Sequence, residues 1–169
     1  MMVTLNALPN KPVLIFAYGN LSRGDDALGP LLLDYIERHA EHILPTVELL
    51  SDFQLQIEHA LDLEQRMLVL FVDASVACRT AVDFTELEPI KDKSYTSHAM
   101  SPAAVLAVYQ SITQQAPPPC FLLSIKGEQF ELGEGLSANA KLHLTQACSY
   151  VEQLLADLRV SAWRQRATG

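Results

Sequence analysis

Three side chains with metal-binding chemistry occupy equivalent places along the sequence. Asp26 follows a short apolar run and a loop with two glycines, Asp73 follows the apolar run 67–72, and His98 precedes another helical segment. Two carboxylates and an imidazole are an oxygen and nitrogen ligand set suited to a divalent ion such as nickel or zinc. The same three groups could also serve as an acid–base cluster.

Each of these residues also has an ordinary structural interpretation. Asp26 and its neighbour Asp25 could stabilise the dipole of a following helix, and Asp73 could be a turn residue. His98 could be a loop or capping histidine. The hypothesis of a shared site therefore depends on their common position, just beyond strand ends. The other four histidines lie on or beside predicted helices, and we expect them to be solvated: His39, His42, His59 and His143.

The elements that must position these residues alternate between two periodicities. Short apolar runs predict buried strands at 13–18, 47–50, 67–72 and 120–125, with an edge strand at 81–87. Helices are predicted at 25–40, 54–61, 101–112 and 137–158, with caps at Asp52, Ser101 and Ser137.

This alternation predicts an α/β fold. We expect one domain over 1–169, a three-layer α/β/α sandwich with a mainly parallel sheet, and a frayed tail at 161–169. In such sheets ligands bind beyond the carboxyl ends of the strands. Asp26, Asp73 and His98 should therefore meet at that edge.

The composition excludes several classes of function. The 169 residues carry 20 acidic and 12 basic side chains, a net charge of -8, so a nucleic-acid partner or an anionic membrane surface is not expected. We find no apolar run of membrane-spanning length and no signal peptide. The cysteines Cys78, Cys120 and Cys148 form no CxxC pair, which favours buried thiols and a cytoplasmic location.

The glycine-containing loop does not match the nucleotide-binding motifs. Gly19 and Gly24 have the spacing of a P-loop, but no Lys-Ser or Lys-Thr follows, and no GxGxxG or GxSxG motif is present. The acidic pair Asp25 and Asp26 would repel a phosphate at this position. We therefore expect no tightly bound organic cofactor.

Four segments together resemble the hydrogenase maturation endopeptidases. The run 18–30, YGNLSRGDDALGP, is similar to the opening motif of that family, and the strand end 72–74, VDA, to its second acidic position. The run 97–101, SHAMS, is similar to its histidine segment, and 127–137, GEQFELGEGLS, to its late glycine-rich segment. The segments occur in the family's order and cover most of the chain.

The resemblance implies a peptide-bond hydrolase. These enzymes remove a C-terminal extension from the large-subunit precursor of a nickel-iron hydrogenase after nickel insertion. The nickel-recognising and catalytic positions correspond to Asp26, Asp73 and His98, and nickel would be a feature of the substrate. Asp26 stands where Glu is common, and Ala27 where Gly is frequent. The HAMSP run suggests the branch that serves soluble NAD-reducing hydrogenases.

Two questions stay open at this level. The bond could be cut with metal polarisation or metal-activated water, or with Asp26 or Asp73 as a general base, as in an aspartyl-type peptidase. The alternative functions are a generic metallohydrolase with a resident zinc at the same residues, and a metal-gated assembly chaperone that binds the precursor without cutting it.

Overall fold

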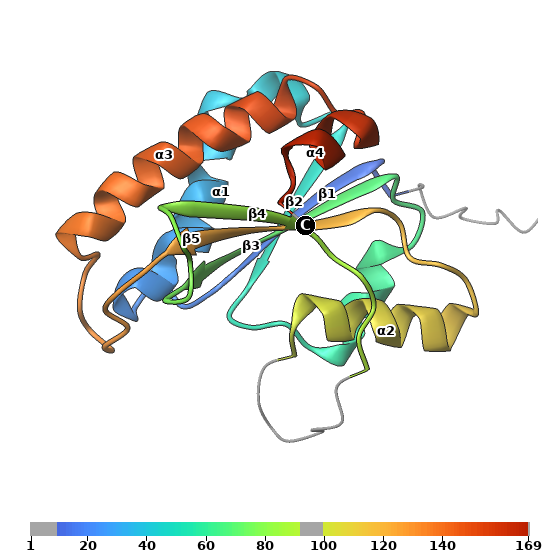
Figure 1. Ribbon diagram of the computed structural model, residues 1–169, viewed down its shortest axis with the longest axis horizontal. Helices are drawn as coiled ribbons and strands as arrows, with labels where there is room; N and C mark the ends of the chain where they lie inside the picture. The colour runs from blue at the N-terminus through green and yellow to red at the C-terminus, as the bar shows by residue number, and fades with distance from the viewer. Residues whose placement is uncertain (1–9, 92–99, 169) are drawn as a thin grey trace, which may run out of the picture.

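A five-stranded sheet forms the centre of the protein, with helices on both of its faces (Figure 1). The computed structural model describes residues 10–91 and 100–168. The strands are β1 (Val13–Tyr18), β2 (Val47–Asp52), β3 (Leu68–Ser75), β4 (Val82–Glu86) and β5 (Cys120–Lys126). The α-helices are α1 (Leu28–His39), α2 (Pro102–Thr113), α3 (Ala138–Leu155) and α4 (Val160–Arg166), and the 3-10 helices are η1 (Gly24–Ala27), η2 (Glu41–Ile43) and η3 (Ile57–Leu63).

The strand order is β2-β1-β3-β5-β4. The first three pairings are parallel, and β4 pairs antiparallel with β5 at the edge. Continuous apolar runs form β1 and β3 because both faces of a central parallel strand are covered. The predicted three-layer α/β/α sandwich with a mainly parallel sheet is confirmed, including the edge strand.

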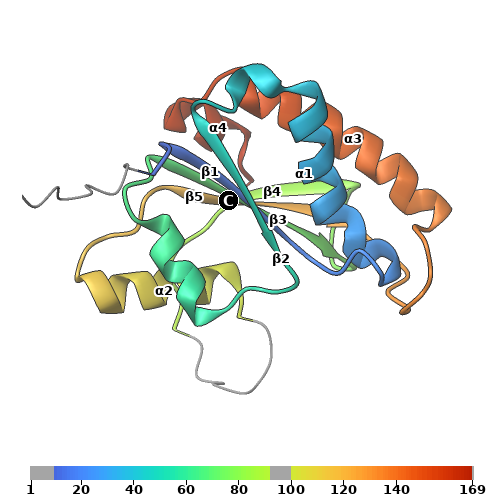
Figure 2. The same ribbon diagram turned by 180° about the vertical axis from the view of Figure 1, so that it is seen from behind.

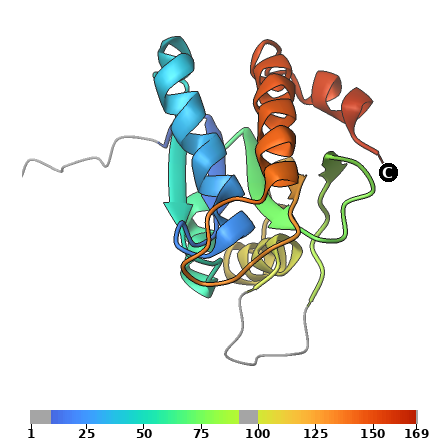
Figure 3. The same cartoon turned by 90° about the vertical axis from the view of Figure 1, so that its left-hand side faces the viewer.

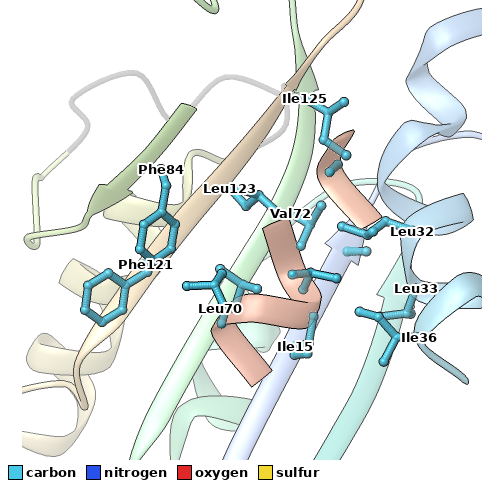
Figure 4. Close-up of a cluster of buried hydrophobic side chains, with 14 of the residues drawn as sticks. Ile15, Leu32, Leu33, Ile36, Leu70, Val72, Phe84, Phe121, Leu123 and Ile125 are labelled. Carbon is cyan, nitrogen blue, oxygen red and sulfur yellow. The ribbon is translucent and has the colours of Figure 1, made fainter. Parts of the chain in front are cut away.

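Each face of the sheet has its own hydrophobic core. Helices α1 and α3 lie side by side over one face (Figure 3), and Figure 4 shows Ile15, Leu70 and Val72 of the strands directed toward Leu32 and Ile36 of α1. The alternate strand residues, which include Leu14 and Phe16, face α2 and η3 on the other side (Figure 2). Side chains on a strand alternate between faces, so the position of each polar residue fixes its layer.

Several predicted element boundaries change. The first helix begins with the 3-10 turn η1 before α1, and the helix predicted to reach 158 ends at Leu155. The central strand runs on to Ser75, so Asp73 lies within β3 and does not follow it. The caps Ser101 and Ser137 are confirmed, since their hydroxyls accept hydrogen bonds from the third N–H that follows, at 3.1 and 3.2 Å.

The helix predicted at 54–61 is also corrected. It is the 3-10 helix η3, and Asp52 does not cap it but ends β2. The Asp52 carboxylate instead accepts hydrogen bonds from the Phe53 N–H at 2.7 Å and from the His59 ring at 3.1 Å. His59 is buried against Phe16, so the expectation that it is solvated is wrong.

The expectation of a frayed tail at 161–169 is wrong over its described part. Helix α4 forms there because Trp163 is buried in the first core, where its ring packs on those of Phe84 and Phe121. The indole N–H donates to the Leu154 carbonyl at 3.0 Å. A single buried tryptophan removes enough apolar surface from water to order a short helix.

Two further expectations concern the whole chain. Cys78, Cys120 and Cys148 are free and buried, as predicted. No helix in the described part of the chain is long and apolar enough to cross a membrane.

Candidate functional site

A row of polar side chains crosses the sheet near the carboxyl ends of its strands. Tyr18 of β1 lies opposite Asp52 of β2, and Asp73 of β3 lies opposite Ser124 of β5. The residues just before Tyr18 and Asp73 are themselves paired, so the row is continuous from β1 to β3. All four side chains share the face that carries α2 and η3, because residues opposite one another in a sheet point the same way.

Asp73 is the most unusual member of this row. Its Oδ2 accepts a hydrogen bond from the Tyr18 hydroxyl at 3.0 Å, while its buried Oδ1 has no hydrogen-bond partner among the described residues. Burial raises the pKa of Asp73 from 3.8 to about 6, against the lowering effect of the Ser124 and Tyr18 hydroxyls, and the nearby charge of Asp26 adds to the rise. A buried carboxylate oxygen without a partner is costly, and such atoms are typical of binding or catalytic sites.

Asp26 reaches the same edge of the sheet from η1. Its Oδ2 accepts a hydrogen bond from the Asn20 N–H at 2.7 Å, which ties the carboxylate to the loop after β1. Gly19 begins this loop with a φ of +149°, and a Cβ there would lie 2.0 Å from the carbonyl oxygen of Asp26. Only glycine lets the backbone pass this close, so the motif's first glycine places Asp26.

The start of α1 packs directly on the strand ends. A Cβ at Gly29 would lie 3.0 Å from the Val72 carbonyl oxygen and 3.1 Å from that of Tyr18. The close approach brings η1, which precedes α1, against the carboxyl ends of β1 and β3. Asp26 and Asp73 therefore lie near enough for the charge of Asp26 to raise the pKa of Asp73.

Asp25 has a different position from its neighbour. It is fully buried and accepts four hydrogen bonds, from the N–H groups of Glu128, Gln129 and Ser137 and from the Ser137 hydroxyl, at 2.8 to 3.0 Å. Burial alone would raise the pKa of Asp25, but these bonds outweigh it and lower the pKa. Asp25 thus fastens η1 to the late glycine-rich segment, and its role is structural.

Backbone hydrogen bonds reinforce this junction. The N–H of Gly24 donates to the Glu134 carbonyl at 3.0 Å, and that of Gly133 donates to the Ser22 carbonyl at 2.7 Å. A Cβ at Gly24 would lie 2.3 Å from the Gln129 carbonyl oxygen. The first and last family-like segments are therefore packed together, although more than a hundred residues separate them.

His98 lies outside the described residues. In the described part of the chain, no group of three histidine, cysteine, aspartate or glutamate residues could hold a metal ion. The chain re-enters the described region at Met100, whose N–H donates to the Leu55 carbonyl at 3.2 Å just after the carboxyl end of β2. The structure therefore brings together two of the three predicted residues.

Two residues of this edge were missed from the sequence. Tyr18 was assigned only to the apolar strand, and His59 was assigned to solvent. His59 accepts from the Gln56 N–H through Nδ1 at 2.8 Å and donates through Nε2 to Asp52 at 3.1 Å. Both ring nitrogens are occupied, so His59 holds η3 to β2 and is unsuited to bind metal. The sequence did contain a signal for both residues: each is a polar ring that lies at or shortly after the end of a predicted strand, where the site was expected.

Comparisons with known proteins place this arrangement in a class of folds. No protein-family model matches the sequence, and no curated protein matches it. The structure, however, is similar to solved structures of hydrogenase maturation proteases, so the resemblance seen in the sequence is confirmed at the level of the fold.

Three of these structures illustrate the similarity. A nickel-iron hydrogenase maturation protease, HycI from Thermococcus kodakarensis KOD1, has a TM-score of 0.65 and 20% identity, over 87% of this chain and 94% of that one. The hydrogenase maturating endopeptidase HybD from E. coli has a TM-score of 0.62 and 21% identity, over 84% and 91%. A hydrogenase 2 maturation peptidase from Thaumarchaeota archaeon SCGC_AB-539-E09 has a TM-score of 0.61 and 20% identity, over 86% and 99%.

Proposed function

We propose that this chain is an endopeptidase that removes the C-terminal extension of a nickel-iron hydrogenase large-subunit precursor after nickel insertion. The observation that carries the proposal is Asp73, a buried carboxylate with one unpartnered oxygen beside Asp26, in a fold shared with hydrogenase maturation proteases. Because the three cysteines are free, we place the reaction in the cytoplasm. The HAMSP run favours a soluble NAD-reducing hydrogenase as the substrate branch.

In this proposal Asp26, Asp73 and His98 recognise nickel that the precursor already holds. His98 is two residues before Met100, which is anchored beside the carboxyl end of β2. Two carboxylates and one imidazole leave coordination positions open, and thiolates of the precursor would supply the softer ligands that nickel also accepts. The site is then complete only when a loaded precursor is bound.

The surface around this edge suits a polypeptide substrate. Each of three neighbouring strands, β2, β1 and β3, is followed at its carboxyl end by an exposed apolar side chain, namely Phe53, Leu21 and Val76. Apolar groups gathered around a polar site are typical of surfaces that bind another protein. This arrangement supports a protein substrate rather than a small molecule.

The chemistry of the cut has two candidate routes on these residues. Nickel could polarise the scissile carbonyl or activate water. Alternatively Asp73, whose pKa of about 6 lies near neutrality, could take a proton from the attacking water through its unpartnered Oδ1. In both routes the free oxygen of Asp73 is the reactive one.

The first prediction concerns nickel gating. Nickel-loaded precursor should lose its extension when incubated with the protein, whereas precursor without nickel should not. Without nickel, the three side chains have no ion through which to bind the precursor. His98→Ala should weaken binding of loaded precursor much more than binding of empty precursor. The measurements are the precursor mass by mass spectrometry and a pull-down with both precursor forms.

The other outcomes of this experiment identify the alternatives. Equal cutting of loaded and empty precursor, together with stoichiometric zinc in the purified protein, would replace the proposal by a resident-zinc metallohydrolase. Tight binding of loaded precursor with no change in mass would replace it by an assembly chaperone.

The second prediction concerns Asp26. Asp26→Ala should lower processing by at least roughly 100-fold, because loss of a direct ligand should cost at least as much as the about 10–100-fold typical of its outer partners. Asp26→Glu should keep a measurable part of the activity. Gly19 and Gly24 are tightly packed, so the backbone of this loop cannot shift to accommodate a longer side chain. The Glu side chain must therefore change its own conformation, which is possible because position 26 is half-exposed. The measurement is kcat/KM for loaded precursor.

Asp34→Ala provides the matched control for this series. Asp34 is an exposed carboxylate on α1 that pairs with Arg38 at 3.2 Å. Its removal should leave processing unchanged. Full activity of Asp26→Ala would remove this carboxylate from the site.

A further inference from the structure

Tyr18 is the side chain that distinguishes the two oxygens of Asp73. It is the last residue of β1, and the parallel pairing of β1 with β3 places it beside Asp73 on the same face of the sheet. Its hydroxyl donates to Oδ2 of Asp73 at 3.0 Å, whereas Oδ1 has no partner among the described residues. Among the residues that the structure describes, the carboxylate is therefore held by Oδ2 and not by Oδ1.

The phenol can act only as a donor to Asp73. A phenol carries one O–H donor and an ionised carboxylate only accepts, so the hydrogen bond runs from Tyr18 to Oδ2 of Asp73. A carboxylate oxygen that accepts a hydrogen bond has less electron density to offer a metal, and the outer partner also fixes the orientation of the group. Oδ1 is then the oxygen that is available to a ligand.

Other groups of the row do not substitute for Tyr18. Ser124 lies opposite Asp73 and its hydroxyl lowers the pKa of Asp73, but Oδ1 of Asp73 has no hydrogen-bond partner among the described residues, so Ser124 does not hold Oδ1. Asp52 is already bound to His59 and to the Phe53 N–H. Tyr18 thus makes a hydrogen bond of defined length to Asp73, at 3.0 Å to Oδ2.

We propose that Tyr18 is a positioning residue, which occupies Oδ2 of Asp73 and so makes this carboxylate bind the nickel of the substrate through Oδ1 alone. The inference rests on the proposed function and adds a residue to it. It implies that the Tyr18 hydroxyl makes Asp73 bind the metal through one oxygen. Phenylalanine has nearly the same shape but no hydroxyl, so Tyr18→Phe should lose this monodentate geometry.

The test compares the natural chain with Tyr18→Phe, with Ni²⁺ as the probe. Infrared difference spectra on addition of Ni²⁺, recorded with ¹³C-aspartate-labelled protein, report whether a carboxylate binds by one oxygen or two. The bands of Asp73 are those absent from Asp73→Asn. The natural chain should show a monodentate Asp73. Tyr18→Phe should lose that signature, and its kcat/KM for nickel-loaded precursor should fall about 10-fold, as for other outer partners of metal ligands.

Tyr35→Phe is the matched control. Tyr35 lies on α1, and its hydroxyl donates to Glu152 of α3, so this variant also loses one hydrogen bond from a phenol to a carboxylate. It should retain the monodentate spectrum and the activity. A merely structural role of Tyr18 would lower the thermal stability of Tyr18→Phe without changing the Asp73 spectrum.

Several results would overturn the inference. One is a bidentate Asp73 in the natural chain, which can be recorded even if Tyr18→Phe does not fold. Another is an Asp73 spectrum that does not respond to Ni²⁺, or is unchanged in Tyr18→Phe, while the natural chain cuts loaded precursor. These results leave the proposed function standing, whereas failure of the natural chain to cut loaded precursor removes the proposed function itself.

Discussion

Asp73→Asn should unfold less readily than the natural chain at neutral pH and should cut no precursor. The buried carboxylate of Asp73 costs stability when ionised, because its pKa is raised from 3.8 to about 6. A difference of about two pH units corresponds to roughly 3 kcal/mol. Since the new amide N–H must itself find a partner, we expect a net gain of roughly 2 kcal/mol. The Asn oxygen can still accept the hydrogen bond from Tyr18.

The pH dependence gives this prediction its sign. An acid whose pKa is raised by folding contributes most stability when it is protonated, below 3.8, and this contribution is lost as the pH rises through about 6. The advantage of Asp73→Asn should therefore be largest above about pH 7 and should disappear toward pH 4. Urea unfolding of both chains across this range measures the difference.

The comparison between the two chains isolates Asp73 from the other titrating groups. A variant that is no more stable than the natural chain at pH 7 would mean that Asp73 is not destabilising in the folded state. A variant that still processes precursor would exclude Asp73 from the reaction. The combination of higher stability with lost function is the pattern expected of a residue kept for its chemistry.

Asp25→Ala should have the opposite effect and destabilise the fold severely. The substitution leaves three N–H groups and one hydroxyl without their acceptor in a fully buried place. Each buried unpaired group costs about 1–3 kcal/mol, and water entering the cavity would relieve part of this cost. We expect a loss of roughly 4 kcal/mol, measured as the free energy of unfolding in urea.

The neighbouring acids provide the controls for this variant. Asp34→Ala removes an exposed carboxylate from α1 and should change stability by less than about 1 kcal/mol. Asp26→Ala should also change stability less than Asp25→Ala, since Asp26 accepts one hydrogen bond, from Asn20. If Asp25→Ala were as stable as Asp34→Ala, the junction with the late glycine-rich segment would not depend on Asp25.

The layers of the fold could be predicted because the pattern that encodes them is local. Continuous apolar runs and helical spacing within ten to fifteen residues were enough to give the strands and helices around the sheet. The predictions were wrong where contacts between residues far apart in the sequence determine the structure. Trp163 orders α4 by packing on Phe84 and Phe121, and a short polar segment gives no sign of these partners.

The site was predictable to a similar degree. Asp26 and Asp73 could be placed together because the ends of parallel strands meet at one edge. The division of labour between Asp25 and Asp26 was not accessible, because it depends on hydrogen bonds to Glu128, Gln129 and Ser137. The contribution of Tyr18 depends on strand register, which a pattern of apolar residues does not fix.

The fastening of η1 by Asp25 has a consequence for the order in which the protein is made. The four hydrogen bonds join residues that are 103 to 112 positions apart. On a ribosome, Asp25 emerges long before Ser137, so the turn that carries Asp26 lacks these four hydrogen bonds until most of the chain has been synthesised. A nascent chain that stops before residue 137 should therefore lack the contacts that fasten this turn, and under the proposed function it should be inactive.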